Sequence, residues 1–67
     1  MIKQKLITKR IEKNKTQEEI AHLLGMTQSQ YSRRESGITK ITKSEWDSLA
    51  KILGTNMEAI YEPEDGI

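Results

Sequence analysis

The sequence predicts an all-α domain of five short helices, in which the second and third form a helix–turn–helix. Apolar residues recur at helical spacing, and no stretch of four or more residues alternates apolar and polar side chains as a strand would. Threonine stands three residues before Glu or Gln at four places, which is the pattern of a capping box. Because apolar residues at helical spacing follow each box, the four boxes predict four helix starts.

The first helix is expected over residues 2–13, ahead of the first box. Its apolar residues recur at spacings of four or five and are expected to face the core: Ile2, Leu6, Ile7 and Ile11. Asn14 follows this helix, and asparagine tolerates the left-handed conformation that commonly ends a helix.

The second helix is expected over residues 17–24, and the box Thr16–Glu19 marks its start. Gly25 follows at once and ends the helix, since glycine adopts the left-handed conformation without steric cost. The side chains expected to face the core are Ile20, Ala21 and Leu24.

The third helix is expected over residues 28–36, between the box Thr27–Gln30 and Gly37. The small side chain of Ala21 would let this helix cross the preceding one closely. A tight corner of two helices is the geometry of a helix–turn–helix, but it also occurs in helical bundles that do not bind DNA. The residues on the exposed face of the third helix therefore have to distinguish a DNA-binding helix–turn–helix from an ordinary helical bundle.

The last two helices are expected over residues 43–53 and 56–61, at the boxes Thr42–Glu45 and Thr55–Glu58. Pro63 prevents extension of the fifth helix. The side chains expected to face the core are Trp46, Leu49, Ala50 and Leu53 in the fourth helix, and Met57 and Ile60 in the fifth.

The composition fits one small domain without catalytic chemistry. The 67 residues allow a single core, expected over residues 1–62 with an acidic tail at 63–67. The absence of cysteine excludes a disulfide framework and a thiolate metal site, and we expect no metal, no cofactor and no enzymatic activity. No apolar stretch is long enough to span a membrane or to form a signal peptide, so we expect a cytoplasmic protein without membrane contact.

Charge is distributed unevenly along the chain. Four acidic residues lie among the last ten, so residues 1–57 carry 11 Lys and Arg against 6 Asp and Glu. A basic body favours a polyanionic partner such as nucleic acid, although a charge asymmetry of this size also fits an ordinary solvated surface.

The outward face of helix 28–36 indicates contact with DNA bases. When Tyr31 is placed inward, a rotation of about 100° per residue puts Glu35 on nearly the same side and leaves no carboxylate in the middle of the opposite face. Glutamine can pair with adenine and arginine with guanine in the major groove, and short serines allow close approach. The residues expected to contact bases are Gln28, Ser29, Ser32 and Arg33. The competing interpretation is that these side chains only solvate the surface.

Helix N-termini and cationic side chains around this face are expected to hold DNA phosphates. The first turns of helices 17–24 and 43–53 present backbone N–H groups at the positive end of the helix dipole. The lysines among the candidates are as compatible with plain solvation as with phosphate contact. The residues expected to contact phosphate are Lys15, Thr16, Gln17, Thr27, Arg34, Lys40, Lys43 and Ser44.

Residues along nearly the whole chain fit one known pattern. They are Arg10; Thr16, Gln17, Ile20, Ala21, Leu24 and Gly25; Thr27, Gln28, Ser29, Tyr31, Ser32, Arg33, Glu35 and Gly37; and Leu49, Ala50, Leu53 and Gly54. With these residues the chain resembles the phage-repressor and Cro-like helix–turn–helix family. The resemblance implies a compact five-helix, lambda-repressor-like domain that binds double-stranded operator DNA as a homodimer. It also implies that Gln17 holds a phosphate and supports Gln28, and that Arg10 and Glu35 form a structural ion pair.

Three residues depart from the pattern of this family. Arg34 stands where the family usually has an apolar residue, so we expect its stem on the core and its charged group toward a phosphate. Lys15 replaces a commonly apolar residue and adds charge. Leu23 occupies a usually polar, exposed position, where it would be available to a protein partner together with the fifth helix.

These observations predict a prokaryotic or phage transcriptional regulator that binds a palindromic operator as a homodimer and represses by occluding a promoter. One alternative is a DNA-binding antitoxin that neutralises a toxin through Leu23, the fifth helix or the acidic tail. A second alternative is a protein-interaction module that has lost DNA readout, against which Gln28 and Arg33 argue.

Overall fold

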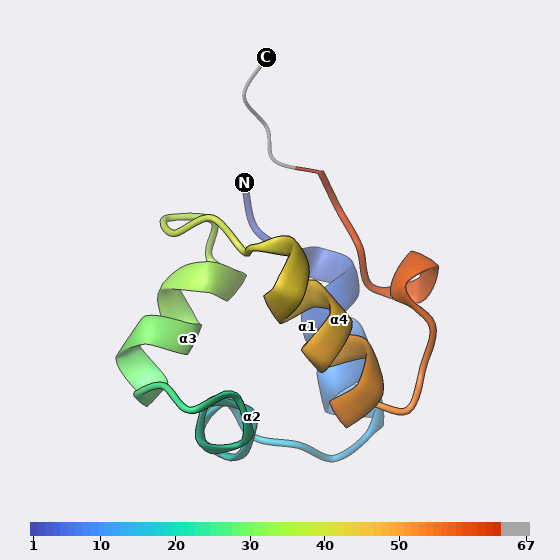
Figure 1. Cartoon of the computed structure of the whole chain (residues 1–67), viewed down its shortest axis with the longest axis horizontal. Coiled ribbons are helices and arrows are strands. Elements are labelled where there is room, and N and C mark those ends of the chain that lie inside the picture. Colours follow the sequence, from blue (N-terminus) through green and yellow to red (C-terminus); the bar gives the residue numbers. More distant parts are fainter. Residues whose placement is uncertain (64–67) are drawn as a thin grey trace.

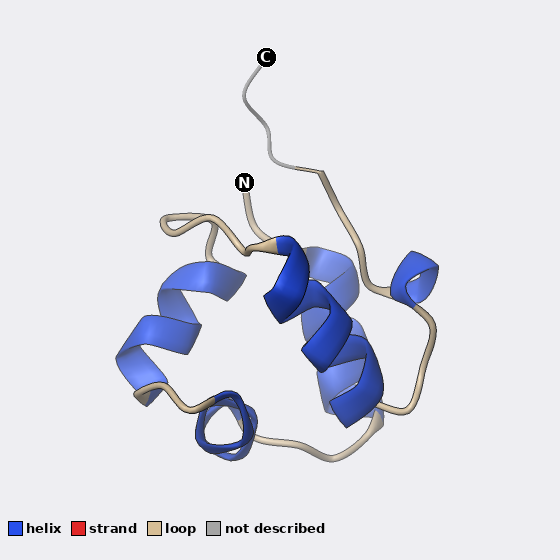
Figure 2. Cartoon of the chain, in the orientation of Figure 1, coloured by secondary structure: helices blue, strands red, loops and turns tan. Residues whose placement is uncertain are grey.

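Four α-helices and one 3-10 turn form the computed structural model, which describes residues 1–63. The helices are α1 (Gln4–Glu12), α2 (Gln17–Leu24), α3 (Gln28–Glu35) and α4 (Lys43–Ile52), and the turn is η1 (Met57–Ala59). Residues 1–63 contain no strand (Figure 2), so the all-α prediction is confirmed. The predicted count of five helices is wrong, because the fifth element is only a 3-10 turn. Most of the predicted acidic tail, residues 64–67, lies outside the described residues.

The helices surround one core, with α2 at one end of the molecule and α3 and α4 on either side of it (Figure 1). α2 packs against both α3 and α4, while η1 packs against α1 and α4. α1 also packs against α3. No helix within residues 1–63 has the length and apolar character needed to cross a membrane. The buried core consists of Leu6, Ile20, Ala21, Tyr31, Ile41, Trp46, Leu49, Ala50, Leu53 and Ile60.

Three of the four predicted capping boxes are present and begin α2, α3 and α4. In each box the threonine hydroxyl accepts a hydrogen bond from the backbone N–H three residues later, and the Glu or Gln side chain there accepts one from the threonine N–H. All of these hydrogen bonds are 2.8–3.1 Å long. The pairs are Thr16–Glu19, Thr27–Gln30 and Thr42–Glu45.

The fourth box, Thr55–Glu58, does not form. Asn56 takes the capping position instead, and its Oδ1 accepts a hydrogen bond from the Ala59 N–H at 3.0 Å. Asparagine caps a helix as well as threonine does, so the neighbouring residue displaces Thr55 from this role. The following turn closes at Ala59, which explains why the predicted helix over 56–61 is reduced to η1.

The first helix begins two residues later than predicted, and two of its expected core residues are exposed. Ile2 precedes the helix and is 55% exposed, while Ile11 is 60% exposed. Leu6 is the fully buried apolar residue of α1. The face of α1 toward the core also carries Arg10, and Lys3 just before the helix is 1% exposed. Polar anchoring therefore replaces part of the expected apolar stripe.

The turn between α2 and α3 has the predicted conformation. Gly25 lies in the left-handed region at φ 75°, and its N–H closes the end of α2. Ala21 is 1% exposed, and α2 packs closely against α3. Asn14, after α1, also has a positive φ of 58°, as predicted. The helix–turn–helix is thus formed by α2, this turn and α3.

Candidate nucleic-acid interface

The four residues predicted to contact bases lie together on the outward side of α3. Gln28, Ser29, Ser32 and Arg33 line one shallow hollow on the surface. We call these four residues the reading face. Within residues 1–63, none of their side chains makes a hydrogen bond or an ion pair to the rest of the chain. Their donors and acceptors therefore remain available to a ligand.

The other side chains of α3 are either bonded to protein groups or buried. Gln30 belongs to the capping box with Thr27, where it accepts a hydrogen bond at 2.9 Å. Arg34 bonds to Glu45 in α4 at 3.0 Å. Glu35 is 2% exposed and Tyr31 is fully buried. Tyr31 and Glu35 therefore lie on the buried side of α3, as helical periodicity predicted.

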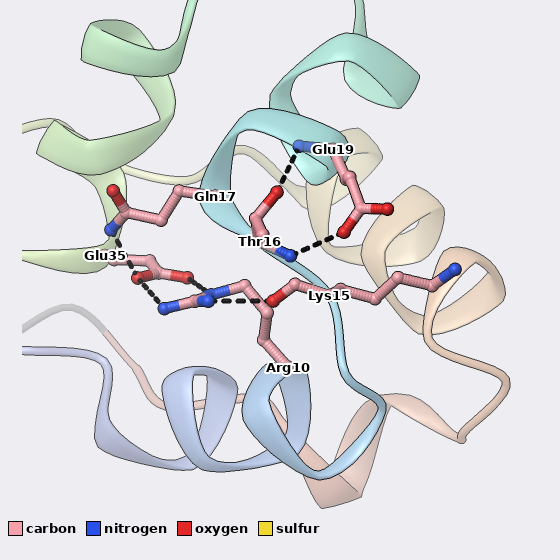
Figure 3. Close-up of polar contacts among 6 residues, drawn as sticks. All are labelled: Arg10, Lys15, Thr16, Gln17, Glu19 and Glu35. Atoms are coloured by element: carbon pink, nitrogen blue, oxygen red, sulfur yellow. Dashed lines mark hydrogen bonds and ion pairs between the residues drawn. The ribbon is translucent and has the colours of Figure 1, made fainter.

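Glu35 is the centre of a polar network that joins three helices (Figure 3). Arg10 from α1 contacts its carboxylate through Nε at 2.7 Å and through a second nitrogen at 3.3 Å. Gln17 from α2 donates to the same carboxylate at 2.9 Å. Arg10 also donates to the Lys15 carbonyl at 2.9 Å, which fixes the loop before α2. The network holds α3 by its buried side and leaves the reading face outward.

Together, burial and the charge of Glu35 shift the pKa values of Arg10 and Tyr31 further above physiological pH. Burial alone would lower the pKa of Arg10, but the hydrogen bond and the charge of Glu35 outweigh it and raise the pKa. Burial raises the pKa of Tyr31, and the neighbouring Glu35 carboxylate raises it further. Arg10 therefore remains a cation and Tyr31 a neutral phenol at physiological pH.

Most of the residues predicted to contact phosphate lie in two segments of the chain. The first segment is the start of α2, where the Lys15 side chain extends away from the Glu35 network (Figure 3) and Thr16 is exposed. The second is the loop before α4 together with its first turn, where Lys40, Lys43 and Ser44 are exposed. Thr27, at the start of α3, is also exposed, although its hydroxyl accepts the capping hydrogen bond.

Comparison with known families identifies this arrangement. A helix-turn-helix family model matches residues 6–60, which covers all four helices and η1 except for the first residues of α1. The chain belongs to the Cro-like helix-turn-helix family. This family comprises phage repressors and related DNA-binding regulators. Comparisons with curated proteins and with solved structures gave no match.

One contact implied by the family resemblance differs in this helix-turn-helix protein. The amide of Gln17 was expected to support Gln28, but it donates to Glu35 instead. The Glu35 carboxylate carries the stronger partial charges, so it is the better acceptor for a partly buried amide. Gln17 thus ties α2 to the far end of α3 rather than to its first turn.

Arg34 also differs from the expectation, because its guanidinium is held by protein groups. Its Nε donates to Glu45, and NH1 donates to the Gln30 carbonyl at 2.9 Å. Burial of Glu45 would raise the pKa of this carboxyl, but the hydrogen bonds and charge of Arg34, with Thr42, lower it instead. From the sequence, Glu45 was expected only to cap α4. A partly buried cation such as Arg34 requires an acidic partner, and this requirement was the missed signal.

Proposed function

We propose that this helix-turn-helix protein is a sequence-specific transcriptional regulator that inserts α3 into the major groove of DNA. The observation that carries this proposal is the reading face, whose side chains are outward, free of carboxylates and without partners in the described chain. Glutamine, serine and arginine side chains without a carboxylate among them suit a polyanionic ligand that presents hydrogen-bonding groups.

The chemistry of the reading face supports discrimination between bases. Gln28 can donate and accept at once and so matches the N6 and N7 edge of adenine, while Arg33 matches O6 and N7 of guanine. Ser29 and Ser32 are short enough for the helix backbone to approach the base edges. We propose these four residues as the base contacts.

Phosphate contacts are proposed for the groups that flank the reading face. The capped first turns of α2 and α4 carry backbone N–H groups, which favour anions together with the helix dipole. Phosphate contacts fix the position of the protein, whereas base contacts provide the specificity. The proposed phosphate contacts are Lys15, Thr16, Gln17, Thr27, Lys40, Lys43 and Ser44.

A homodimer on a two-fold operator is the proposed assembly, and occlusion of a promoter is the proposed mechanism. Two copies of α3 would reach the same side of DNA when half-sites lie one helical turn apart, about 10 base pairs. Leu23 at 57% and Tyr61 at 43% exposure are apolar side chains available to a second copy or to another protein. Selection of binding sites from random DNA tests the proposal, since it returns the sequence, spacing and symmetry of the half-sites together. Failure to enrich any site would favour a protein-interaction module instead.

Arg33→Ala should weaken binding to the selected operator by about 1–3 kcal/mol and relax the preference at one base position. The physical reason is the loss of a two-pronged pairing with one guanine. The measurement is a repeat of the site selection together with titration of the operator and its single-base variants. An equal loss on random DNA would show that Arg33 contacts only phosphate.

Lys43→Ala should weaken binding to all DNA sequences alike. The lysine is exposed at the start of α4, and its removal should lower the magnitude of the salt slope by about one, because one fewer counterion is released. Affinity measured against salt concentration, for the operator and for an unrelated duplex, gives this slope. If the affinity and the slope both stay unchanged, Lys43 is only a solvated charge.

A further inference from the structure

A salt bridge between Arg34 and Glu45 joins α3 to the first turn of α4. The Arg34 Nε lies 3.0 Å from Glu45 Oε1, and NH1 lies 2.9 Å from the Gln30 carbonyl oxygen. The same Glu45 oxygen accepts the capping hydrogen bond from the Thr42 N–H at 3.1 Å. The two side chains are 18% and 20% exposed. Both charged groups are therefore held at two points each and partly shielded from water.

This pair bridges two helices whose backbones lie apart. Within residues 1–63, no Cα atom of α3 lies within 8 Å of one in α4, although both helices pack against α2. Figure 1 shows α3 and α4 on either side of α2. The hydrogen bond from Arg34 to Glu45 is the one side-chain hydrogen bond between α3 and α4 in the described chain. It is thus a direct constraint on the orientation of one helix relative to the other.

The bridge joins the two helices that carry the surfaces proposed to meet DNA. Arg34 follows Arg33 of the reading face, and Glu45 follows Lys43 and Ser44 in the first turn of α4. Without the carboxylate, the Arg34 guanidinium would keep only the Gln30 carbonyl as a partner and could also bind a nearby phosphate. Such a contact adds affinity for all DNA and no information about sequence.

We propose that Arg34 and Glu45 are a positioning pair that increases the specificity of DNA binding. The pair holds the reading face at a fixed distance from the phosphate-binding turn of α4, and Glu45 keeps the Arg34 guanidinium away from DNA phosphates. This role rests on the proposed function, and it predicts a higher ratio of operator affinity to affinity for unrelated DNA when the pair is intact.

A double-mutant cycle with Arg34→Met and Glu45→Gln tests this role. Glu45→Gln removes the charge and keeps the capping box, since glutamine fills the same position in the Thr27–Gln30 box. Arg34→Lys is a third variant. It keeps the charge but lacks the planar guanidinium that bonds to Glu45 and to the Gln30 carbonyl at once. The affinities for the selected operator and for an unrelated duplex are measured by fluorescence anisotropy, at a temperature where thermal melting shows every variant to be folded.

Each of the two substitutions in the cycle should lower the operator-to-unrelated affinity ratio by about three- to tenfold, and the double variant should lower it no further. Glu45→Gln should also strengthen binding to the unrelated duplex and steepen its salt dependence, because it releases the Arg34 cation. Arg34→Lys should give an intermediate ratio.

Additive effects in the cycle, or an unchanged ratio in every variant, would overturn the positioning role and leave the pair a contribution to stability alone. A wild-type chain that binds both duplexes equally would instead overturn the proposed function, and the positioning role with it. If the wild type has a high ratio of operator affinity to unrelated affinity and every variant keeps it, only the positioning role fails and the proposed function stands.

Discussion

Arg10→Met should lower the free energy of unfolding by about 3–5 kcal/mol, because it leaves a buried carboxylate without its cation. The Glu35 side chain is 3% exposed, and Arg10 Nε lies 2.7 Å from it. After the substitution the Gln17 amide remains as a neutral donor to the carboxylate. A domain of this size is marginally stable, so the loss should bring it close to unfolding. Urea denaturation followed by the fluorescence of Trp46, the single tryptophan, measures the change.

Lys9→Met is the matched control for this prediction. Lys9 lies on the same helix and pairs with Glu12 at 3.0 Å, but the two side chains are 26% and 56% exposed. An exposed pair of this kind contributes about 0.5 kcal/mol or less. The double variant Arg10→Met, Glu35→Leu should recover part of the loss, since it removes both charges of the buried pair. Equal effects of Arg10→Met and Lys9→Met would show that Glu35 does not depend on Arg10.

The helix starts could be predicted from sequence where the determining contact is local. A capping box joins residues only three positions apart, so Thr16, Thr27 and Thr42 mark the starts of α2, α3 and α4 correctly. The start of α1 depends instead on a contact that is distant in sequence. The Lys3 N–H donates to the carbonyl of Glu35, 32 positions further along the chain, at 2.8 Å. Periodicity cannot reveal such a contact, which is why Ile2 was wrongly placed in the core.

The candidate site also has one part that could be predicted from local sequence and one part that could not. The reading face follows from the rotation per residue of a single helix, so its four members could be grouped without a structure. The partner of Arg34 could not be found in this manner, because the distance between α3 and α4 is set by how both pack on α2. Glu45 already had a local role in the capping box, and its second role became visible only in three dimensions.

Gly37→Ala should lower the free energy of unfolding by about 3 kcal/mol, through two separate costs. Gly37 has a φ of 87°, which is unfavourable for any side chain, and a Cβ there would lie within 2.6 Å of backbone atoms of Met1. Residues 1–3 would have to move away from the end of α3. The movement would break the hydrogen bond from the Lys3 N–H to the Glu35 carbonyl. Thermal or urea unfolding of the purified variant measures the total.

Gly25→Ala and Gly54→Ala separate the two costs. These glycines have φ values of 75° and 63°, yet a Cβ on either would meet no atom of residues 1–63 within 4 Å. Each substitution should therefore show only the backbone cost, about 1–2 kcal/mol. The additional loss in the free energy of unfolding for Gly37→Ala then measures how strongly residues 1–3 are held against the end of α3. If all three substitutions lower the free energy of unfolding equally, residues 1–3 can move away without cost and do not stabilise α3.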